Sequence, residues 1–294
     1  MVFWRLRNLR CFCRLVRWKW MVRRIPPDHL CFNVQGLRLY LSPHDVGLSP
    51  ELAVERVHEP ILTATLRTLL RPNMTVVDVG ANLGYFALLA ARAVGPSGKV
   101  LALEPFPESY RLLKKNIQAN GLQNVLPYAF AAGHRSGPDK LYFYPQSNWN
   151  SLFLKNDKRK PLGWIEVQVC TLNELLATEP RVDVIRMDVE GAELAVLKGS
   201  DRILKKHRPT LIIETHPTLM GEDQYAEFLH FLKQMGYSIE EAWERWREEP
   251  VWPRRLSTYY KAGREVRKLD VDYLLALESA VTIIANCRGS ESPE

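Results

Sequence analysis

Apolar and polar positions between residues 71 and 131 switch between the two-residue period of strands and the 3.6-residue period of helices. The predicted elements are strands at 75–80, 99–104 and 124–131 and helices at 85–94 and 108–120. The first strand is rich in valine, the first helix is rich in alanine, and Gly121 ends the second helix. Strands and helices therefore alternate here.

The second half of the chain repeats the alternation. Strands are predicted at 182–188, 210–214, 237–239 and 280–286, helices at 192–206 and 225–235, and two added strands at 141–144 and 165–169 around a polar loop. Strands that alternate with helices are joined by right-handed crossovers into a mainly parallel sheet. The pattern thus predicts an α/β fold with a doubly wound sheet.

The first 70 residues precede this pattern. Pro26-Pro27 separates an N-terminal arm from a predicted hairpin at 29–34 and 37–41 and a helix at 60–70. We expect four parts: the basic arm at 1–27, the hairpin and helix at 28–70 packed on the core, a main domain at 71–288 with an insertion at 240–279, and a tail at 289–294.

The segment 240–279 is charged and aromatic and lies outside the alternation. Loops longer than roughly 12–15 residues in compact domains are usually functional or disordered. We interpret it as a lid or acceptor-binding insertion, with simple packing as the alternative. Its aromatic residues are Trp243, Trp246, Trp252, Tyr259, Tyr260 and Tyr273.

Charge is unevenly distributed. The 294 residues carry a net charge of +7, from 40 basic and 33 acidic residues, and 46% of them are hydrophobic, enough for a sizeable core. Eight basic residues and no carboxylate lie in 1–27, so the remainder is nearly neutral. We therefore expect no specific nucleic-acid partner. No apolar stretch reaches the roughly 20 residues of a membrane-spanning helix.

The five cysteines form neither paired CxxC units nor a cluster with histidines at zinc spacing. We expect reduced thiols in an intracellular compartment, and hence a cytoplasmic protein.

The arm has the pattern of an amphipathic helix. If residues 2–20 are helical, one side carries an apolar stripe with arginines beside it. The stripe consists of Val2, Leu6, Leu9, Cys13, Val16 and Trp20. This pattern favours peripheral contact with an anionic membrane, with Trp4, Trp18 and Trp20 at the headgroups. The alternative is an arm that packs on its own domain or stays mobile.

The most informative stretch runs from the first strand through a turn into a helix. The turn, GANLG at 80–84, lets the backbone approach a ligand near a helix N-terminus. Asp78 is a carboxylate inside the apolar strand, where burial is costly without a partner. It therefore suggests a network that positions a cationic or amine-bearing ligand.

Glu104 ends the second strand, 20 residues beyond Gly84. At that edge of a doubly wound sheet a carboxylate can accept both hydroxyls of a ribose, which predicts a nucleoside ligand. The turn lacks the Gly-x-Gly-x-x-Gly pattern of pyrophosphate binding. S-adenosylmethionine, with one ribose and no phosphate, therefore fits better than NAD.

These motifs resemble the FkbM family of methyltransferases. The resemblance rests on 77–85, Glu104-Pro105, 186–199 with its DVEGAE block, and 209–216, and it covers about residues 29–237. It implies a class I S-adenosylmethionine-dependent fold, a seven-stranded sheet with an antiparallel last strand, and O-methylation of sugar, polyketide or related hydroxyls. The predicted cofactor-binding residues are Asp78, Gly80, Ala81, Asn82, Gly84, Tyr85, Glu104, Pro105, Ala131 and Asp188.

The acceptor's proton needs a base. Asp188, Glu190, Glu214 and His216 follow two core strands at the edge where such sheets bind ligands, and His216 or Asp188 is the predicted base. The same four side chains could instead bind Mg²⁺ or Mn²⁺, and the sequence does not decide between base and metal.

The sequence therefore predicts an O-methyltransferase acting on a hydroxyl of a glycan, a lipid-linked sugar or a secondary metabolite. Asn148, Asn150 and Ser151 are predicted on the acceptor side, where Trp149 either stacks on a sugar or, as is commoner for aromatic residues, packs within the protein. Two alternatives remain, an NAD(P)-dependent oxidoreductase and a catalytically silent adenosylmethionine-binding or membrane-associated module.

Overall fold

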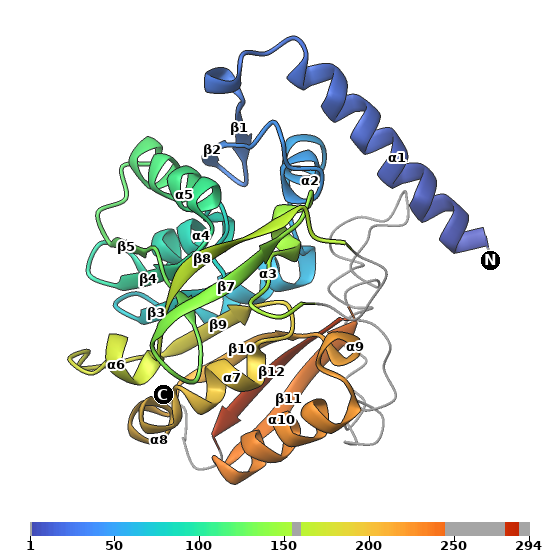
Figure 1. Cartoon of the computed structure of the whole chain (residues 1–294). Helices are drawn as coiled ribbons and strands as arrows, with labels where there is room; N and C mark the ends of the chain where they lie inside the picture. The colour runs from blue at the N-terminus through green and yellow to red at the C-terminus, as the bar shows by residue number, and fades with distance from the viewer. Residues whose placement is uncertain (1, 155–159, 245–279, 288–294) are drawn as a thin grey trace.

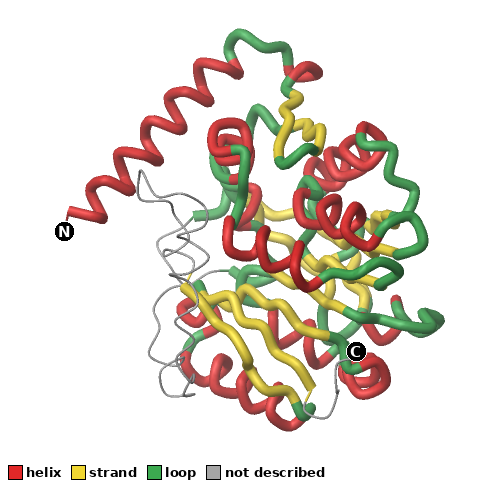
Figure 2. The backbone as a smooth tube through the Cα atoms, turned by 180° about the vertical axis from the view of Figure 1, so that it is seen from behind, coloured by secondary structure: helices red, strands yellow, loops and turns green. Residues whose placement is uncertain are grey.

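The fold was obtained as a computed structural model, which describes residues 2–154, 160–244 and 280–287. A central sheet lies between two layers of helices (Figure 1), and the view from behind shows helices on both sides of the strands (Figure 2). The helices α6 to α10 and the strands β9 to β12 occupy one half of the molecule, and the N-terminal elements the other.

The central sheet has seven strands in the order β11-β12-β10-β9-β3-β4-β5. Its strands are β3 (Thr75–Val79), β4 (Lys99–Leu103), β5 (Val125–Tyr128), β9 (Val184–Asp188), β10 (Thr210–Thr215), β11 (Tyr237–Glu244) and β12 (Val281–Cys287). The last strand, β12, runs antiparallel to both neighbours, and β5, β4, β3, β9 and β10 are parallel. The predicted doubly wound, mainly parallel seven-stranded sheet is confirmed.

Successive residues of the central strands point to opposite faces, so the strands are apolar on both. Val76 and Val184 contribute to one buried cluster, and Val77 and Ile185 to the other. The first face is covered by α2 (Leu48–Glu55), α3 (Pro60–Leu69), α4 (Tyr85–Val94) and α5 (Pro107–Ala119). The second is covered by α6 (Leu172–Leu175), α7 (Glu193–Lys198), α8 (Asp201–His207), α9 (Pro217–Met220) and α10 (Glu222–Gln234).

The predicted strand at 124–131 is wrong as one element. β5 ends at Tyr128, whose carbonyl accepts the amide of Glu104, and Ala131 then pairs with Val169 in another sheet. This three-stranded sheet consists of β6 (Ala131–Ala132), β8 (Gly163–Cys170) and β7 (Gly137–Phe143), in that order. The two added strands predicted at 141–144 and 165–169 are its β7 and β8.

The predicted helix at 192–206 is also wrong as one element, because α7 and α8 are separate. A side chain at Gly199 would meet the carbonyl oxygen of Gly133 at 2.0 Å, so the chain turns here where two backbones touch. The Ser200 hydroxyl bonds back to the carbonyl of Val196 at 3.0 Å, which satisfies the end of α7.

The insertion predicted at 240–279 begins too early, because its first residues belong to a strand. β11 is longer than the predicted strand at 237–239, and residues 240–244 belong to it. Trp243, assigned to the insertion, is 6% exposed and packs in the core. The rest of the predicted insertion and the tail at 289–294 lie outside the described residues, and the lid stays a prediction.

The N-terminal region contains the predicted helix and hairpin, as α1 (Val2–Val22), β1 (Cys31–Val34) and β2 (Leu37–Tyr40). Trp18 is 1% exposed, and its indole N–H donates to the carbonyl of Asp45 at 3.1 Å. The prediction that Trp18 lies at the lipid headgroups is therefore wrong. Within the described part of the chain, every helix is too short or too polar to span a bilayer.

Candidate functional site

The turn after β3 brings two neighbouring strands into close contact. Gly80 has a φ of 80°, and a side chain there would meet the carbonyl oxygen of Asp188 at 2.1 Å. The amides of Gly80 and Ala81 both donate to the carbonyl of Leu103, at 3.0 and 2.9 Å. Glycine is therefore required at position 80, because only a bare backbone fits between β4 and β9.

Glu104 closes the opposite side of this turn. Its two oxygens accept the amides of Asn82 and Phe106, each at 2.8 Å. The side chain is buried, and burial raises its pKa to about 7 although the two amides oppose the shift. Each carboxylate oxygen can accept more than one hydrogen bond, so Glu104 can still receive ligand hydroxyls.

Asp78 lies behind the turn and pairs with Arg186. The guanidinium of Arg186 donates to Asp78 at 3.2 Å, to the carbonyl of Gly80 at 3.2 Å and to Asp188 at 3.1 Å. It also lies 4.6 Å from the ring centre of Phe86. Burial raises the pKa of Asp78 and Asp188, and Arg186 opposes both shifts. Arg186 thus ties two carboxylates of adjacent strands to the glycine turn.

A second ionic group surrounds His216. Its Nδ1 lies 2.8 Å from Glu193, and its Nε2 lies 3.6 Å from Glu190 and 3.7 Å from Glu214. Burial alone would lower the pKa of His216, but the three carboxylates raise it to about 10. In this arrangement the imidazole of His216 is protonated on both nitrogens and positively charged at neutral pH, and each nitrogen faces a carboxylate.

The turn after β9 is backbone-strained. Glu190 has a φ of 53°, which few residues other than glycine adopt, and Gly191 follows with a φ of 102°. The hydroxyl of Ser151 donates to the Glu190 carbonyl at 2.8 Å and fixes this conformation. Such strain is often found at functional sites.

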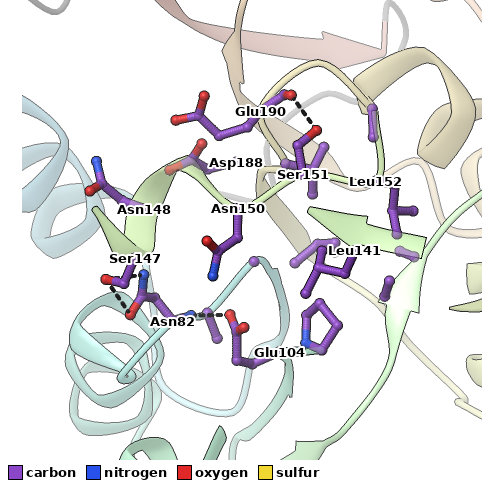
Figure 3. A pocket seen from close by; sticks show the side chains of 18 of the residues that line it. Asn82, Glu104, Leu141, Ser147, Asn148, Asn150, Ser151, Leu152, Asp188 and Glu190 are labelled. Carbon is purple, nitrogen blue, oxygen red and sulfur yellow. Dashed lines mark hydrogen bonds between the residues drawn. The ribbon is translucent and has the colours of Figure 1, made fainter. Parts of the chain in front are cut away.

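These elements line one pocket, whose empty space is about 800 Å³ when its open mouth is included. In Figure 3, Asp188 and Glu190 lie on one side, Glu104 on the other, and Asn150 between them. Eight of the ten predicted cofactor residues line it: Gly80, Ala81, Asn82, Tyr85, Glu104, Pro105, Ala131 and Asp188. Asp78 and Gly84 do not line it.

Of the predicted catalytic residues, Asp188 and Glu190 line the pocket, whereas Glu214 and His216 lie behind them. Asp188, Glu214 and His216 each offer one ligand atom, and these atoms lie within 4.8 Å of one another, a spacing compatible with a divalent cation. Metal binding by this group stays a prediction.

One wall of the pocket is a loop that sequence reasoning placed only loosely. Ser147 is hydrogen-bonded to Asn82 at 3.1 Å, and its amide donates to Asp45 at 2.9 Å. Asn148, Asn150 and Ser151 line the pocket as well. Trp149 is not among the lining residues and packs edge-on against Tyr144.

Sequence reasoning missed His58 altogether. It lines the pocket from the turn before α3, with Nδ1 3.1 Å from Glu51 and Nε2 3.0 Å from Glu59. Burial lowers the pKa of His58, but the two carboxylates raise it to about 10. The only sequence signal of these two contacts is a histidine between two glutamates within residues 51–59. Such a local pattern does not show that the histidine faces the pocket.

Comparison with known proteins identifies the family. The model of the FkbM methyltransferase domain matches residues 78–239, which is more than half of the chain. The chain belongs to the FkbM methyltransferase family. The match includes the glycine turn, Glu104 and both ionic groups. The resemblance inferred from sequence motifs is therefore confirmed.

Similar proteins place this FkbM-family chain among methyltransferases. It is 30% identical over 145 residues to methyltransferase 1 of Beauveria bassiana, covering 43% of this chain and 58% of the relative. It is 29% identical over 151 residues to the hexuronic acid methyltransferase AglP of Haloferax volcanii, covering 50% and 57%. The chain thus spans less than two thirds of the length of these curated relatives.

Among solved structures, methyltransferase FkbM from Methylobacillus flagellatus KT superposes with a TM-score of 0.42 at 17% identity. The superposition covers 79% of this chain and 54% of that one.

Proposed function

We propose that this chain is an S-adenosylmethionine-dependent O-methyltransferase that acts on a hydroxyl of a glycan, a lipid-linked sugar or a secondary metabolite. The charge of the pocket carries the proposal. Glu104, Asp188 and Glu190 line it. Of its two cationic lining residues, Arg186 pairs with Asp188 and with Asp78 behind the pocket, and His58 pairs with Glu51 and Glu59, which lie outside the lining. An acidic pocket favours the sulfonium and ammonium of S-adenosylmethionine over the anionic pyrophosphate of NAD.

The lining residues fit this cofactor. Glu104 would accept the ribose hydroxyls, and the 80–82 backbone permits close approach of the cofactor. When bound, the cofactor supplies an electrophilic methyl group, which the acceptor oxygen attacks in line with the leaving sulfur. The chain's own part is to align that oxygen and to take its proton.

Asp188 is better placed than His216 to take the proton. Asp188 lines the pocket, and its Oδ1 is buried without a hydrogen-bond partner within the described structure. His216 lies outside the lining, with both ring nitrogens facing glutamates. We therefore assign proton transfer to Asp188. We assign to His216 the positioning of Glu190, whose backbone carbonyl also accepts a hydrogen bond from the hydroxyl of Ser151.

A hydroxylated acceptor fits the polar wall of the pocket. Asn148, Asn150 and Ser151 offer amide and hydroxyl groups to hydroxyls of a sugar-like molecule. The relative named hexuronic acid methyltransferase supports a sugar acid as the first acceptor to test.

Calorimetry of the full chain tests the cofactor. We expect S-adenosylmethionine to bind with micromolar affinity, on the order of −8 kcal/mol, and NAD not to bind. Methyl transfer to a hexuronic acid or another hydroxylated acceptor would then identify the enzyme. NAD binding would favour the oxidoreductase alternative, and cofactor binding without turnover on any hydroxylated acceptor would favour the silent module.

The pH dependence of cofactor binding tests the role of Glu104. Ribose hydroxyls donate to the ionised carboxylate, whose pKa in the free protein is about 7, so protonation below that pH opposes binding. We expect affinity to strengthen as pH rises, by roughly tenfold between about pH 6 and about pH 8. In the Glu104→Gln control the dependence should be flat and binding weaker. A wild-type affinity that does not change with pH would contradict direct contact with Glu104.

A further inference from the structure

Helix α1 presents two different faces. Trp18 is buried on the side that packs on α2, and Cys11, Leu15 and Met21 on that side are partly buried. On the opposite side Phe12, Val16 and Trp20 are 64%, 51% and 54% exposed. These three are spaced four residues apart, so they form a continuous apolar ridge along the helix. α1 extends beyond the body of the molecule (Figure 1).

The orientation of this ridge is fixed by the contacts beneath it. Trp18 bonds to the carbonyl of Asp45, and the carboxylate of Asp45 accepts the amides of Gly47, Ser49 and Ser147. Arg14 adds an ion pair with Glu51 at 4.0 Å. Because Trp18 anchors the helix on the side opposite the ridge, the ridge cannot turn inward without breaking these contacts.

Cations border the ridge. Arg17, Lys19, Arg23 and Arg24 are exposed, and the guanidinium of Arg24 stacks 4.0 Å from the ring centre of Trp20. Residues 1–27 contain no carboxylate side chain to offset these positive charges. An apolar ridge with tryptophan and flanking basic residues is typical of helices that lie in the plane of an anionic lipid surface.

We propose that α1 binds the surface of an anionic membrane through Phe12, Val16 and Trp20, with the flanking basic side chains at the lipid phosphates. A second copy of this chain is a poorer occupant, because two such faces would bring like charges together at short distance. The proposal goes beyond the catalytic function and does not depend on it, since lipid binding needs neither cofactor nor acceptor.

Sedimentation of the full chain with lipid vesicles tests the proposal. We expect binding to vesicles that contain phosphatidylglycerol in phosphatidylcholine, little binding to phosphatidylcholine alone, and weaker binding at higher salt. The triple variant Phe12→Glu, Val16→Glu, Trp20→Glu leaves Trp18 unchanged, and with it the packing of α1 on α2. Its vesicle affinity should fall by on the order of tenfold or more.

A charge-matched control separates the ridge from net charge. Thr68→Glu, Gln118→Glu and Gln234→Glu place the same three charges on exposed positions of α3, α5 and α10, and this variant should keep most of its vesicle binding. Circular dichroism confirms that both variants are folded. The proposal is wrong if the wild-type chain does not bind anionic vesicles, or if both variants lose binding equally. It is also wrong if light scattering shows a dimer that only the ridge variant loses, without vesicle binding.

Discussion

Replacing Arg186 with methionine is expected to lower the free energy of unfolding by about 3–5 kcal/mol, the cost of leaving buried charges unpaired. Arg186 is the shared partner of Asp78 and Asp188, and its own side chain is 5% exposed. Methionine keeps much of the apolar stem but provides no charge or donor. Two buried carboxylates on adjacent strands would then repel each other. Urea denaturation of the full chain measures the loss.

The loss of unfolding free energy in Arg186→Met should depend on pH in a defined direction. Burial raises the pKa of Asp78 and Asp188 above their ordinary value of 3.8, and Arg186 opposes this. Without Arg186 both pKa values rise further, so the native variant binds more protons than the unfolded chain above about pH 4. Its stability therefore falls as pH rises, and the deficit should be larger at neutral pH than in mild acid.

Two further variants sharpen this test. Adding Asp78→Asn and Asp188→Asn to Arg186→Met removes the uncompensated charges and should restore part of the lost stability. Arg92→Met removes an exposed arginine whose only described hydrogen bond is to the carbonyl of Gln35 at 3.4 Å, and should cost less than about 1 kcal/mol. A loss of that small size in Arg186→Met would contradict the structural role assigned to Arg186.

The Arg186 network also shows what the sequence could predict. The need of Asp78 for a buried network is predictable, because an unpaired carboxylate inside a valine-rich strand would be strongly destabilising. Its partner cannot be found locally, since Arg186 follows 108 residues later and meets Asp78 only through the parallel register of β3 and β9. For this reason the sequence predicts Asp78 in contact with the cofactor, whereas the structure places it behind the pocket.

Local patterns predicted the glycine turn and the position of Glu104 at the end of β4, whereas contact of these residues with a cofactor stays a prediction. A strand, turn and helix that follow one another in sequence leave a continuous signal, and eight of the ten predicted cofactor residues line the pocket. The missed contributions, His58 and Ser147, come from loops whose positions depend on packing against distant elements. Asp45 illustrates this, since its carboxylate joins the loop that contains Ser147 to the N-terminal region.

Element boundaries failed where two backbones meet. The break between α7 and α8 depends on Gly199 touching Gly133, and the end of β5 depends on Ala131 pairing with Val169. Neither contact leaves a periodic pattern in the sequence. The mainly parallel, doubly wound class of the sheet, by contrast, follows from the alternation of strands and helices and from the handedness of the crossovers, and the sequence predicted it.

Replacing Asp188 with asparagine is expected to lower kcat by about 10²–10⁴-fold, the usual contribution of a general base. Asparagine retains an oxygen that can accept from Arg186 but cannot take a proton from the acceptor hydroxyl. Affinity for S-adenosylmethionine should change by less than about tenfold, because Glu104 and the glycine turn remain. Steady-state kinetics and calorimetry on the same preparation separate the two effects.

His216→Gln provides the comparison. If His216 positions the turn through Glu190 rather than taking the proton, this variant should lose less activity than Asp188→Asn and should keep the shape of the wild-type pH–rate profile. A loss of activity as large as in Asp188→Asn, with the acidic limb of the profile abolished only in the histidine variant, would assign the base to His216 instead.

Chelation separates a base from a metal ligand at Asp188. As a base, Asp188 should support full activity after dialysis of the wild-type protein against EDTA. If EDTA abolishes activity and Mg²⁺ or Mn²⁺ restores it, the group Asp188, Glu214 and His216 binds a cation, and the asparagine variant then fails because a ligand is missing. An asparagine variant with wild-type kcat would exclude both roles, and the proton would have to leave through another group of the pocket.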